Sequence, residues 1–362
     1  MKLKKIIMTK HIYNFTSLLF FLCIGVTLWA GNPDRQGEAG SGHLLMTPWA
    51  RSAGLHTLNT ASITGVEAMR LNPAGISRIN KTEFAFGYTS YFNGADINVS
   101  SFGVTTKLNE NASFGVSLMS TDLSDIETTT ENQPEGTGAT FSPRLFNLGV
   151  SYAYIFENKI SVGALVRIVS ESLSDVQALG FGIDAGVQYV TGDQDNFKFG
   201  ISLRNVGSRM SFNGQGLTES LQVPADALDN SQQLAYFQRS QSYELPSLLN
   251  IGLAYDFYFG ADLKLTALGN FTANSFSQDQ LGAGVEFGWK NTFQLRAAYK
   301  YEVGQENTDI APVYSGLAAG FSVNLPLSKD EAKLNNNISI AYAYRQTRIW
   351  SGTHNVTVSL GL

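Results

Sequence analysis

From about residue 82 to the end of the chain, apolar residues alternate with small or polar ones in segments of roughly 10 to 14 residues. The pattern is clear at 146–156, where aromatic and aliphatic residues alternate with Asn, Gly, Ser and Ala, and it recurs at 181–189 and 249–259. A period of two is typical of β-strands that have one apolar face. Strands of soluble proteins average about five or six residues, whereas a tilted strand needs about 9 to 11 residues to cross a bilayer. The length of the segments therefore favours membrane-spanning strands.

The amino-acid composition supports this interpretation and excludes other classes of protein. Only 15% of the residues are charged, against roughly 25% in soluble domains, and Gly (35 residues) and aromatic residues (12%) are frequent. The chain is too apolar for intrinsic disorder, its single Cys cannot form an intramolecular disulfide, and a net charge of −5 does not favour nucleic-acid binding. After residue 30 no apolar run approaches the roughly 18 residues that a membrane-spanning helix needs. A soluble β-sandwich or lectin-like domain is the alternative.

We expect an all-β, transmembrane antiparallel β-barrel of about 14 strands. An even number of strands places both ends of the barrel in the periplasm, so the odd-numbered connections face outward and should be the longer ones. The two longest connections, 123–143 and 208–245, are odd-numbered, and a short helix is expected within 224–237. The connections at 93–96 and 326–333 fit this rule poorly, because the first is short and the second is long. The expected strands are 82–92, 96–107, 112–122, 144–156, 159–171, 178–191, 196–207, 246–259, 262–273, 278–290, 292–304, 312–325, 335–347 and 352–362.

Residues 1–30 have the composition of a secretory signal peptide. Lysines precede an apolar stretch at 15–29, and Ala30 followed by Gly31 offers a cleavage site. An N-terminal anchor helix is the alternative. The single Cys lies in this stretch, so the mature chain would have none, which is compatible with an oxidising periplasm.

Residues 31–80 lack the strand pattern and precede the barrel, which we assign to 81–362. The sequence from Thr64 to Glu67 fits a capping box, which predicts a short helix at 65–71. The helix would end before Pro73, because the residue that precedes a proline avoids the helical region. A compact, partly apolar segment in this position predicts a plug, or hatch, inside the barrel; a periplasmic linker is the alternative. The candidate plug motif is Asn72, Pro73, Ala74 and Gly75, where Gly75 suits a tight turn.

The alternation also assigns side chains to the two faces of the barrel wall. Charged residues on the polar face are candidates for lining the lumen, where pairing with one another or with the plug would offset the cost of burial. Aromatic residues near the strand ends are candidates for belts at the membrane interfaces. The lumen-lining candidates are Arg167, Asp184, Arg204, Lys264, Glu286, Arg296 and Arg345, and the aromatic-belt candidates are Trp289, Trp350, Tyr255, Phe257, Tyr154 and Phe156.

Motifs for catalysis or metal binding are weak. The four His residues do not have metal-ligand spacing, and the chain contains neither an HExxH nor a GxSxG sequence. Gly180 and Gly182 resemble part of a dinucleotide fingerprint, but that fingerprint needs a strand-to-helix turn, and these residues lie within an alternating strand. We therefore expect no catalytic residues, no metal and no cofactor, and a protein that works by binding.

Two short motifs give the chain a family resemblance. The sequence Trp-Ala-Arg-Ser-Ala-Gly-Leu at 49–55 and the sequence Asn-Pro-Ala-Gly at 72–75 precede an aromatic first strand. Together they resemble the PorV/PorQ family, outer-membrane barrels of the type IX secretion system of the Bacteroidetes. The second motif also resembles the broader FadL-like group, whose members have fourteen-stranded barrels with an N-terminal hatch.

The PorV/PorQ resemblance implies a place in the cell outer membrane, with contacts to its lipid and to type IX translocon or attachment-complex proteins. A PorV-like protein would capture the C-terminal signal domains of emerging cargo and pass the cargo on for attachment to the cell surface. A PorQ-like protein would serve within the attachment machinery, and both roles are open. The FadL-like resemblance implies a competing function, the transport of long-chain fatty acids or other hydrophobic molecules. The sparse apolar residues on the inward face weigh against this transport, and no nucleic-acid partner is expected.

Overall fold

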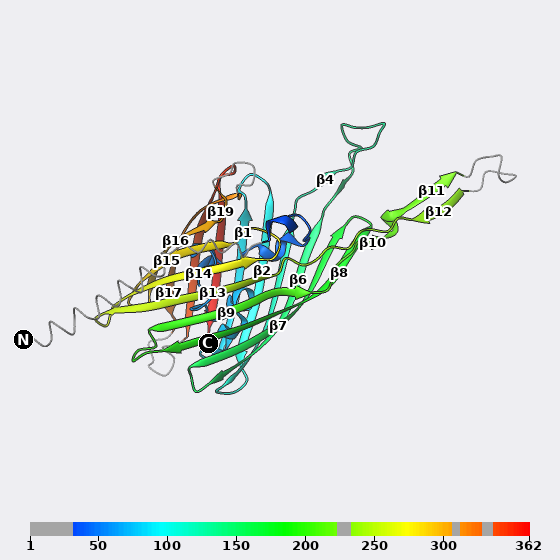
Figure 1. The fold of residues 1–362 in the computed structure, drawn as a ribbon. Coiled ribbons are helices and arrows are strands. Elements are labelled where there is room, and N and C mark those ends of the chain that lie inside the picture. The colour runs from blue at the N-terminus through cyan, green and yellow to red at the C-terminus, as the bar shows by residue number, and fades with distance from the viewer. Residues whose placement is uncertain (1–31, 223–232, 306–311, 328–335) are drawn as a thin grey trace, which may run out of the picture. The chain divides into compact units, whose positions relative to one another are not determined.

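The structure is a computed structural model, and it describes residues 32–222, 233–305, 312–327 and 336–362. The signal peptide predicted at 1–30 lies outside these residues. The described chain consists of long strands and of a set of short helical turns that precede them (Figure 1).

The long strands form a closed antiparallel barrel (Figure 1). Each long strand pairs with its two neighbours along the chain, and the first pairs with the last from Glu83 opposite Gly361 to Ser90 opposite His354. The predicted fold class and the predicted positions of the fourteen strands are confirmed. The strands are β1 (Thr82–Tyr91), β2 (Ile97–Lys107), β3 (Ala112–Asp122), β6 (Arg144–Phe156), β7 (Ile160–Leu173), β8 (Val176–Thr191), β9 (Phe197–Gly207), β13 (Leu248–Phe259), β14 (Leu263–Asn274), β15 (Gln280–Trp289), β16 (Phe293–Glu302), β17 (Tyr314–Pro326), β18 (Asn337–Thr347) and β19 (Thr353–Gly361).

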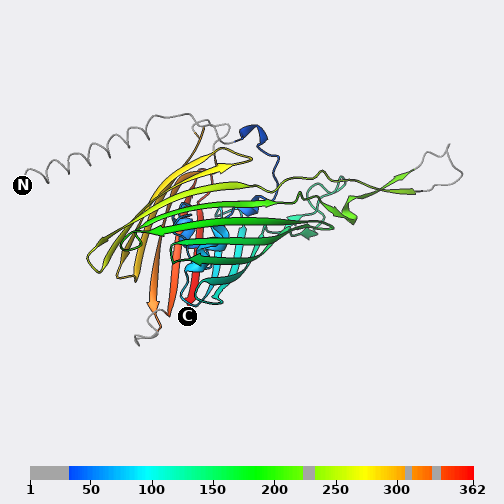
Figure 2. The same cartoon turned by 60° about the horizontal axis from the view of Figure 1, so that its bottom comes forward.

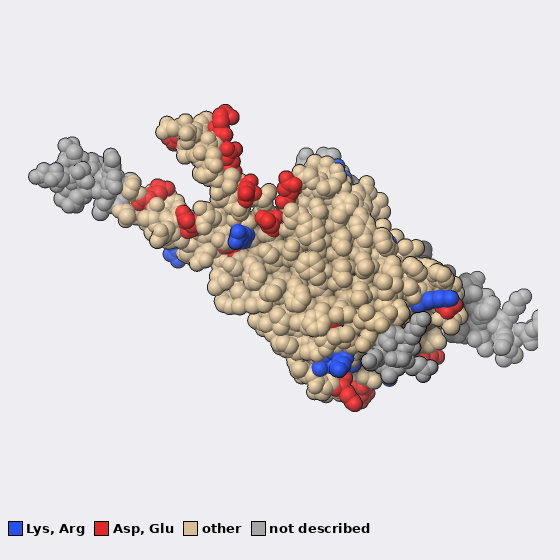
Figure 3. All heavy atoms as spheres, turned by 180° about the vertical axis from the view of Figure 1, so that it is seen from behind, with Lys and Arg blue, Asp and Glu red and all other residues tan. Residues whose placement is uncertain are grey.

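The two faces of each strand differ in burial. In β8, Phe181 and Ile183 are 54% and 55% exposed, whereas Asp184 and Gln188 are buried. Figure 3 shows a barrel wall that is almost free of charged side chains, with Asp and Glu gathered at the long loops. An outward face that is apolar in this way suits contact with lipid, and it accounts for the low content of charged residues.

The connections at the two ends of the barrel differ in length. At the end where β1 begins and β19 ends, tight turns contain residues with positive φ, such as Glu157 and Asn158 (47° and 56°) and Lys290 and Asn291 (53° and 56°). Two-residue hairpins favour this conformation because its twist matches that of the flanking strands. Outer-membrane barrels keep both termini in the periplasm. We therefore call this end periplasmic and the opposite end the outer end.

Two long connections, 123–143 and 208–247, extend from the outer end. The second carries a hairpin that projects well beyond the barrel (Figures 1 and 2). The short elements of these connections are β4 (Ile126–Glu127), β5 (Thr140–Phe141), β10 (Asn213–Gly214), η4 (Gln215–Leu217), β11 (Thr218–Gln222) and β12 (Gln233–Phe237).

The projecting hairpin corrects one prediction. A short helix was expected within 224–237, but residues 233–237 form β12, which pairs with β11 from Thr218 opposite Phe237 to Gln222 opposite Gln233. Hydrogen bonding to a strand that lies more than ten residues away replaces the local helical bonds. Residues 224–232 lie outside the described part of the chain.

Residues 32–81, which we call the N-terminal segment, precede β1; their first residues lie at the outer end, and from about His43 onward the segment runs inside the barrel (Figure 2). Most of its side chains from His43 to Ser77 are buried. No helix among the described residues is long and apolar enough to cross a membrane. The segment contains η1 (Pro33–Arg35), η2 (Gly42–Leu45), α2 (Ala50–Gly54), α3 (Ala68–Leu71) and η3 (Pro73–Arg78).

The helix predicted at 65–71 is present in a shorter form as α3. The predicted capping box does not form, because the Glu67 carboxylate accepts hydrogen bonds from the backbone N (3.0 Å) and the Oγ (2.8 Å) of Ser52. A buried partner from another part of the segment thus replaces the local cap. Asn72 ends α3 in an extended conformation (φ −150°, ψ 99°), as expected for the residue before Pro73, and its Oδ1 accepts from Ala74 N (3.2 Å).

Candidate functional site

Glycines on the inner face of the wall let the backbone of the N-terminal segment approach the strands. A Cβ atom at Gly163 would lie 2.4 Å from the carbonyl carbon of Pro73, and one at Gly200 would lie 2.6 Å from the carbonyl oxygen of Thr60. Both distances are shorter than van der Waals contact, so a larger residue would displace the segment or the strand. These inward glycines therefore act as sockets for the segment.

The Asn-Pro-Ala-Gly motif lies where the segment meets β7 and β8. Asn72 Nδ2 donates to the carbonyl oxygens of Thr60 (3.0 Å) and Val187 (3.1 Å). From the wall, Gln188 Nε2 donates to the carbonyl oxygens of Thr60 (3.2 Å) and Ile63 (2.9 Å). Asn72 thus joins the segment both to itself and to the wall. The other motif residues, Pro73, Ala74 and Gly75, are buried beside it.

Apolar packing fills the spaces between these polar contacts. Leu55 and Leu58 of the segment pack against Ala254, Leu268 and Ala298 of the wall. Large side chains thus come mainly from the segment, and small ones mainly from the wall. A second cluster has the same character and contains Trp49, Ile63, Val66, Met69 and Ile76 of the segment with Ala85, Ala153 and Leu165 of the wall.

Charged residues on the inner face are paired near the middle of the barrel. Arg167 on β7 and Asp184 on β8 form a buried ion pair, and Asp184 Oδ1 also accepts from the backbone N of Asn205 (2.6 Å). Arg204 on β9 donates to the carbonyl oxygen of Leu44 (3.4 Å). Pairing offsets the cost of burying these charges, and Arg204 connects the wall to the segment.

A second charged group lies toward the periplasmic end. Glu286 on β15 accepts from Arg296 Nε on β16 at 2.5 Å and lies 3.7 Å from the Nε of Arg51 on α2. Burial disfavours the charge of Arg51, but the carboxylates around it, Glu286 first, raise its pKa above the ordinary value. The segment therefore contributes a permanent positive charge to this part of the lumen.

Sequence reasoning missed two partners at the same end. Asp256 accepts from Lys198 Nζ at 2.6 Å and lies 3.5 Å from Nζ of Lys264, which is half-buried. Lys198 and Asp256 have the same alternation parity as Arg204 and Asn250, so the strand pattern could have identified them.

Arg345, the last lumen-lining candidate, contacts rings instead of an acid. Its guanidinium lies 4.6 Å from the ring centre of Tyr314 and 5.5 Å from that of Tyr91, distances at which cation–π attraction operates. All seven candidates thus lie on the inner face, but they belong to separate groups and not to a single site.

At the outer end, the start of the N-terminal segment meets the second long connection. Gly40 N donates to the carbonyl oxygen of Glu244 (3.0 Å). The Glu244 carboxylate lies 3.3 Å from Arg35 and 2.8 Å from Arg209. The segment therefore extends from the outer end of the barrel to the periplasmic end, where β1 begins.

A buried polar group joins the same elements just inside the outer end. Tyr243 donates to the Glu171 carboxylate at 2.7 Å, and Nδ1 of His43 lies 3.4 Å from the other carboxylate oxygen. Burial lowers the pKa of His43, although Glu171 opposes the shift, so the ring is neutral at pH 7. Leu44 and Met210 pack in the adjoining apolar cluster.

Five of the aromatic-belt candidates lie on the outward face near the strand ends, Trp350 lies in the connection between β18 and β19, and several of the six pack against other rings. Contact between rings of this kind orients amphipathic side chains at a membrane interface. The pairs are Trp289 with Phe293 (ring centres 5.9 Å apart), Tyr255 with Phe257 (4.7 Å) and Tyr154 with Phe156 (4.7 Å) at the periplasmic end, and Trp350 with Phe92 (4.8 Å) at the outer end.

Residues 32–276 match the model of a protein family described as "Type IX secretion system protein PorV", and this range is more than half of the chain. The chain belongs to the PorV family. It is therefore an outer-membrane barrel of the type IX secretion system and not an enzyme. No match was found among curated protein sequences. Within the described residues, no group of three or more His, Cys, Asp or Glu is arranged to hold a metal ion.

The PorV-family chain also shares its fold with solved outer-membrane channels. A TodX deltaS2S3 mutant, titled a monoaromatic hydrocarbon channel, has a TM-score of 0.56 and 17% identity, covering 86% of this chain and 98% of that chain. The Pseudomonas putida toluene transporter TodX has a TM-score of 0.53 and 17% identity (86% and 96% covered), and a Pseudomonas aeruginosa FadL homologue has 0.51 and 12% (87% and 97%). These likenesses concern the fold, which is that of the FadL-like barrels.

Proposed function

We propose that this PorV-family barrel works by binding proteins at its outer end. It would hold type IX translocon or attachment-complex proteins and the C-terminal signal domains of cargo, and deliver the cargo for surface attachment. The observation that carries the proposal is the packing of the N-terminal segment against the inner wall. In this proposal residues 31–80 are a plug, and residues 81–362 are a rigid barrel that presents loops. A barrel whose interior is packed in this way is suited to binding partner proteins on its surface and not to transport through its lumen.

The second long connection is the proposed partner surface. Its hairpin projects beyond the barrel (Figure 2), and Tyr236 and Phe237 are 37% and 53% exposed on β12. A two-stranded hairpin leaves backbone groups unpaired along its edges, and such edges accept a further strand from a partner. Loops on a rigid scaffold are also where binding residues concentrate.

The hairpin can be tested with a double substitution, Tyr236→Ser with Phe237→Ser. We expect weaker co-purification of translocon and cargo from detergent-solubilised envelopes and less cargo anchored at the cell surface. The matched control is Leu108→Ser, which changes an exposed apolar residue (60% exposed) at the periplasmic end. If replacement of residues 218–237 by a short Gly-Ser link leaves secretion and anchoring normal in a barrel that still shifts on a gel after boiling, the proposal is wrong.

The fold likeness to hydrocarbon channels supports a second candidate, transport of long-chain fatty acids or other hydrophobic molecules. The inner wall argues against it, because the groups described above are charged and the N-terminal segment packs along the wall. An apolar depression of about 710 Å³ does exist, but Ala283, Ala297, Leu317 and Ala319, which line it, lie on the outward face. Saturable binding of a long-chain fatty acid by the purified barrel would favour transport; we expect none.

A further inference from the structure

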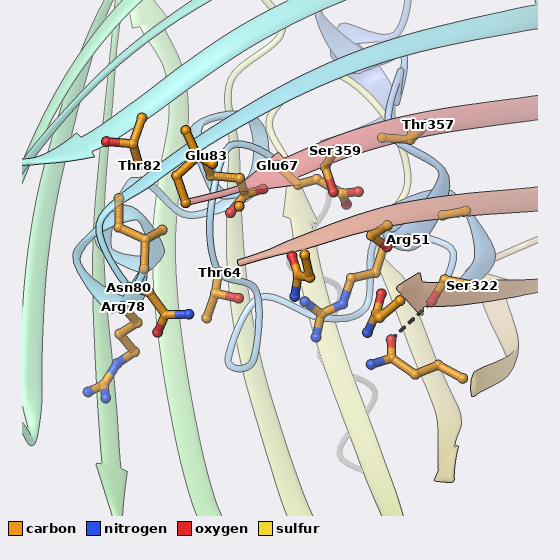
Figure 4. Close-up of a pocket in the computed structure, with 18 of the residues that line it drawn as sticks. Arg51, Thr64, Glu67, Arg78, Asn80, Thr82, Glu83, Ser322, Thr357 and Ser359 are labelled. Atoms are coloured by element: carbon orange, nitrogen blue, oxygen red, sulfur yellow. Dashed lines mark hydrogen bonds between the residues drawn. The ribbon is translucent and has the colours of Figure 1, made fainter. Parts of the chain in front are cut away.

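A polar cavity of about 230 Å³ lies at the periplasmic end, between the N-terminal segment and the first and last strands of the barrel (Figure 4). Most of the strand residues that line it carry hydroxyl or carboxamide groups, which donate and accept hydrogen bonds. The described residues that line it include no aromatic side chain. The composition of the wall therefore suits a polar ligand, not a lipid chain. Among these residues are Gln294, Ser322, Asn324, Asn337, Ser339 and Ser359.

Three arginines line the cavity, but the Arg78 guanidinium donates to the carbonyl oxygens of Asn158 and Lys159, so Arg51 and Arg296 supply its positive side. Arg296 is 4% exposed, and its Nε donates to Glu286. Its Nη2 donates to Gln294 and Ser322, whereas its Nη1 has no hydrogen-bond partner among the described residues. The Nε of Arg51 is buried too, and it lies 3.7 Å from the Glu286 carboxylate without a hydrogen bond to any described residue. A buried donor that lacks an acceptor has lost the hydrogen bond that it would make to water, and this loss is unfavourable. Because both residues line the cavity, an acceptor oxygen placed there would satisfy them.

Two carboxylates supply the negative side. Glu67 uses one oxygen to accept from Ser52, and Glu83 accepts from the backbone N of Val66 at 3.4 Å. Both residues line the cavity, and Figure 4 shows them grouped apart from the Arg51 side chain, which extends into the space from another side. The cavity thus has opposite charges on different walls.

We propose that this cavity binds a small zwitterion that carries a carboxylate and an ammonium group, such as an amino acid or a dipeptide. The carboxylate would lie against Arg51 and Arg296, and the ammonium group against Glu67 and Glu83. A volume of about 230 Å³ equals that of roughly eight water molecules, which limits the ligand to this size. The site is separate from the outer loops, so it goes beyond the proposed secretion role and does not depend on it.

Binding at this site would stabilise the plugged form of the barrel. Arg51 and Glu67 belong to the N-terminal segment, whereas Arg296 and Glu83 belong to the wall. A ligand that contacts both parts binds only when the segment is in place, so it raises the stability of that arrangement in proportion to its concentration. This linkage gives a second readout, the unfolding temperature.

The first experiment uses the intact mature barrel in detergent and titrates glycylglycine by calorimetry. N-acetylglycylglycine lacks the ammonium group, and glycylglycinamide lacks the carboxylate. We expect glycylglycine to bind at least about tenfold more tightly than either blocked probe, and to raise the unfolding temperature. Equal binding of the three probes, or no heat from glycylglycine at about 10 mM, would overturn the proposal.

The second experiment tests which side chains bind the carboxylate and the ammonium group of the ligand. Arg51→Gln should weaken glycylglycine binding about tenfold or more, and Glu83→Gln should remove the preference for the free ammonium group. The matched control is Arg144→Gln, an exposed arginine at the outer end, which should bind as the unsubstituted protein does. Unchanged binding by Arg51→Gln in a correctly folded barrel would assign any measured heat to another site and reject this one. Since the probe comparison uses the unsubstituted protein, it decides the matter even if a variant fails to fold.

Discussion

The outward and inward faces of the same strands differ in what they require of a side chain. Val162 and Ile183 on the outward face are 42% and 55% exposed and meet lipid, so their position demands apolar character and little else. Their sequence neighbours Gly163 and Asp184 point inward and meet particular atoms of the segment or the wall. Adjacent residues of a strand therefore meet different requirements: hydrophobicity on the outward face, and shape and charge pairing on the inward face. Substitutions at neighbouring positions can test this difference.

The largest effect is expected for Asp184→Ala. This change leaves Arg167 buried without its carboxylate, and removal of one partner of a buried ion pair costs about 3–5 kcal/mol. The outward neighbour provides the control, since Ile183→Leu keeps volume and apolarity and should change the free energy of unfolding by less than about 1 kcal/mol. Urea unfolding in lipid vesicles, followed by tryptophan fluorescence, measures both. Recovery of stability by adding Arg167→Met would attribute the loss to the unpaired charge; a loss of similar size in both single variants would contradict the comparison.

A charged substitution on the outward face should lower the free energy of unfolding of the barrel. Ile183→Lys places an ammonium group on the lipid-facing side near the middle of β8, where such a charge costs about 2–4 kcal/mol. The same charge at Gln346, an exposed outward residue close to the outer end of β18, should cost about 0–1 kcal/mol. Unfolding in vesicles gives both values. Equal costs at the two depths would mean that β8 does not face the bilayer there.

A larger side chain on the inward face should lower the stability of the barrel. Gly163→Val would place side-chain atoms where Pro73 already lies, and overpacking of this kind costs about 1–3 kcal/mol. Val162→Ile adds a methylene to the outward side of the adjacent residue and should be nearly neutral. Limited proteolysis of the folded barrel reports on the segment, which should become cleavable only in the Gly163 variant. Resistance of that variant to proteolysis would show that the glycine socket is not needed to seat the segment.

The sequence predicts the strands well because strand signals are local. Alternation, length and turn residues lie within a few positions of one another, so each of the fourteen strands could be located from its own residues. The parity of the alternation also assigned Arg167, Asp184 and Arg296 to one face without knowledge of their partners. The path of the N-terminal segment could not be predicted in this way. Arg51 lies more than 200 residues from Glu286 along the chain, and no local signal connects them.

Two local signals failed for the same reason. Thr64 to Glu67 has the sequence of a capping box, yet the Glu67 carboxylate binds Ser52, which is buried beside it. Residues 233–237 were assigned to a helix, yet they pair with β11 across the hairpin. In both cases a partner distant in sequence satisfies the same groups as the local structure would, and a pattern read over a few residues does not include that partner.

The smallest effect is expected for Asn72→Ala, and it sharpens the comparison by removing hydrogen bonds without adding volume or charge. Asn72 donates to Thr60 and Val187, but Thr60 keeps its bond from Gln188, so the loss should be only about 1–2 kcal/mol. The control is Asn98→Ala, which removes a hydrogen bond from the Tyr88 hydroxyl (2.8 Å) on the outward face, where exposed groups can bond to other polar partners. Hydrogen exchange of the backbone amide of Ala74, which donates to Asn72, should accelerate in the first variant alone. If exchange there stays slow, the shape of the glycine sockets holds the segment without help from the motif's side chain, and the inward face is specified by volume more than by hydrogen bonding.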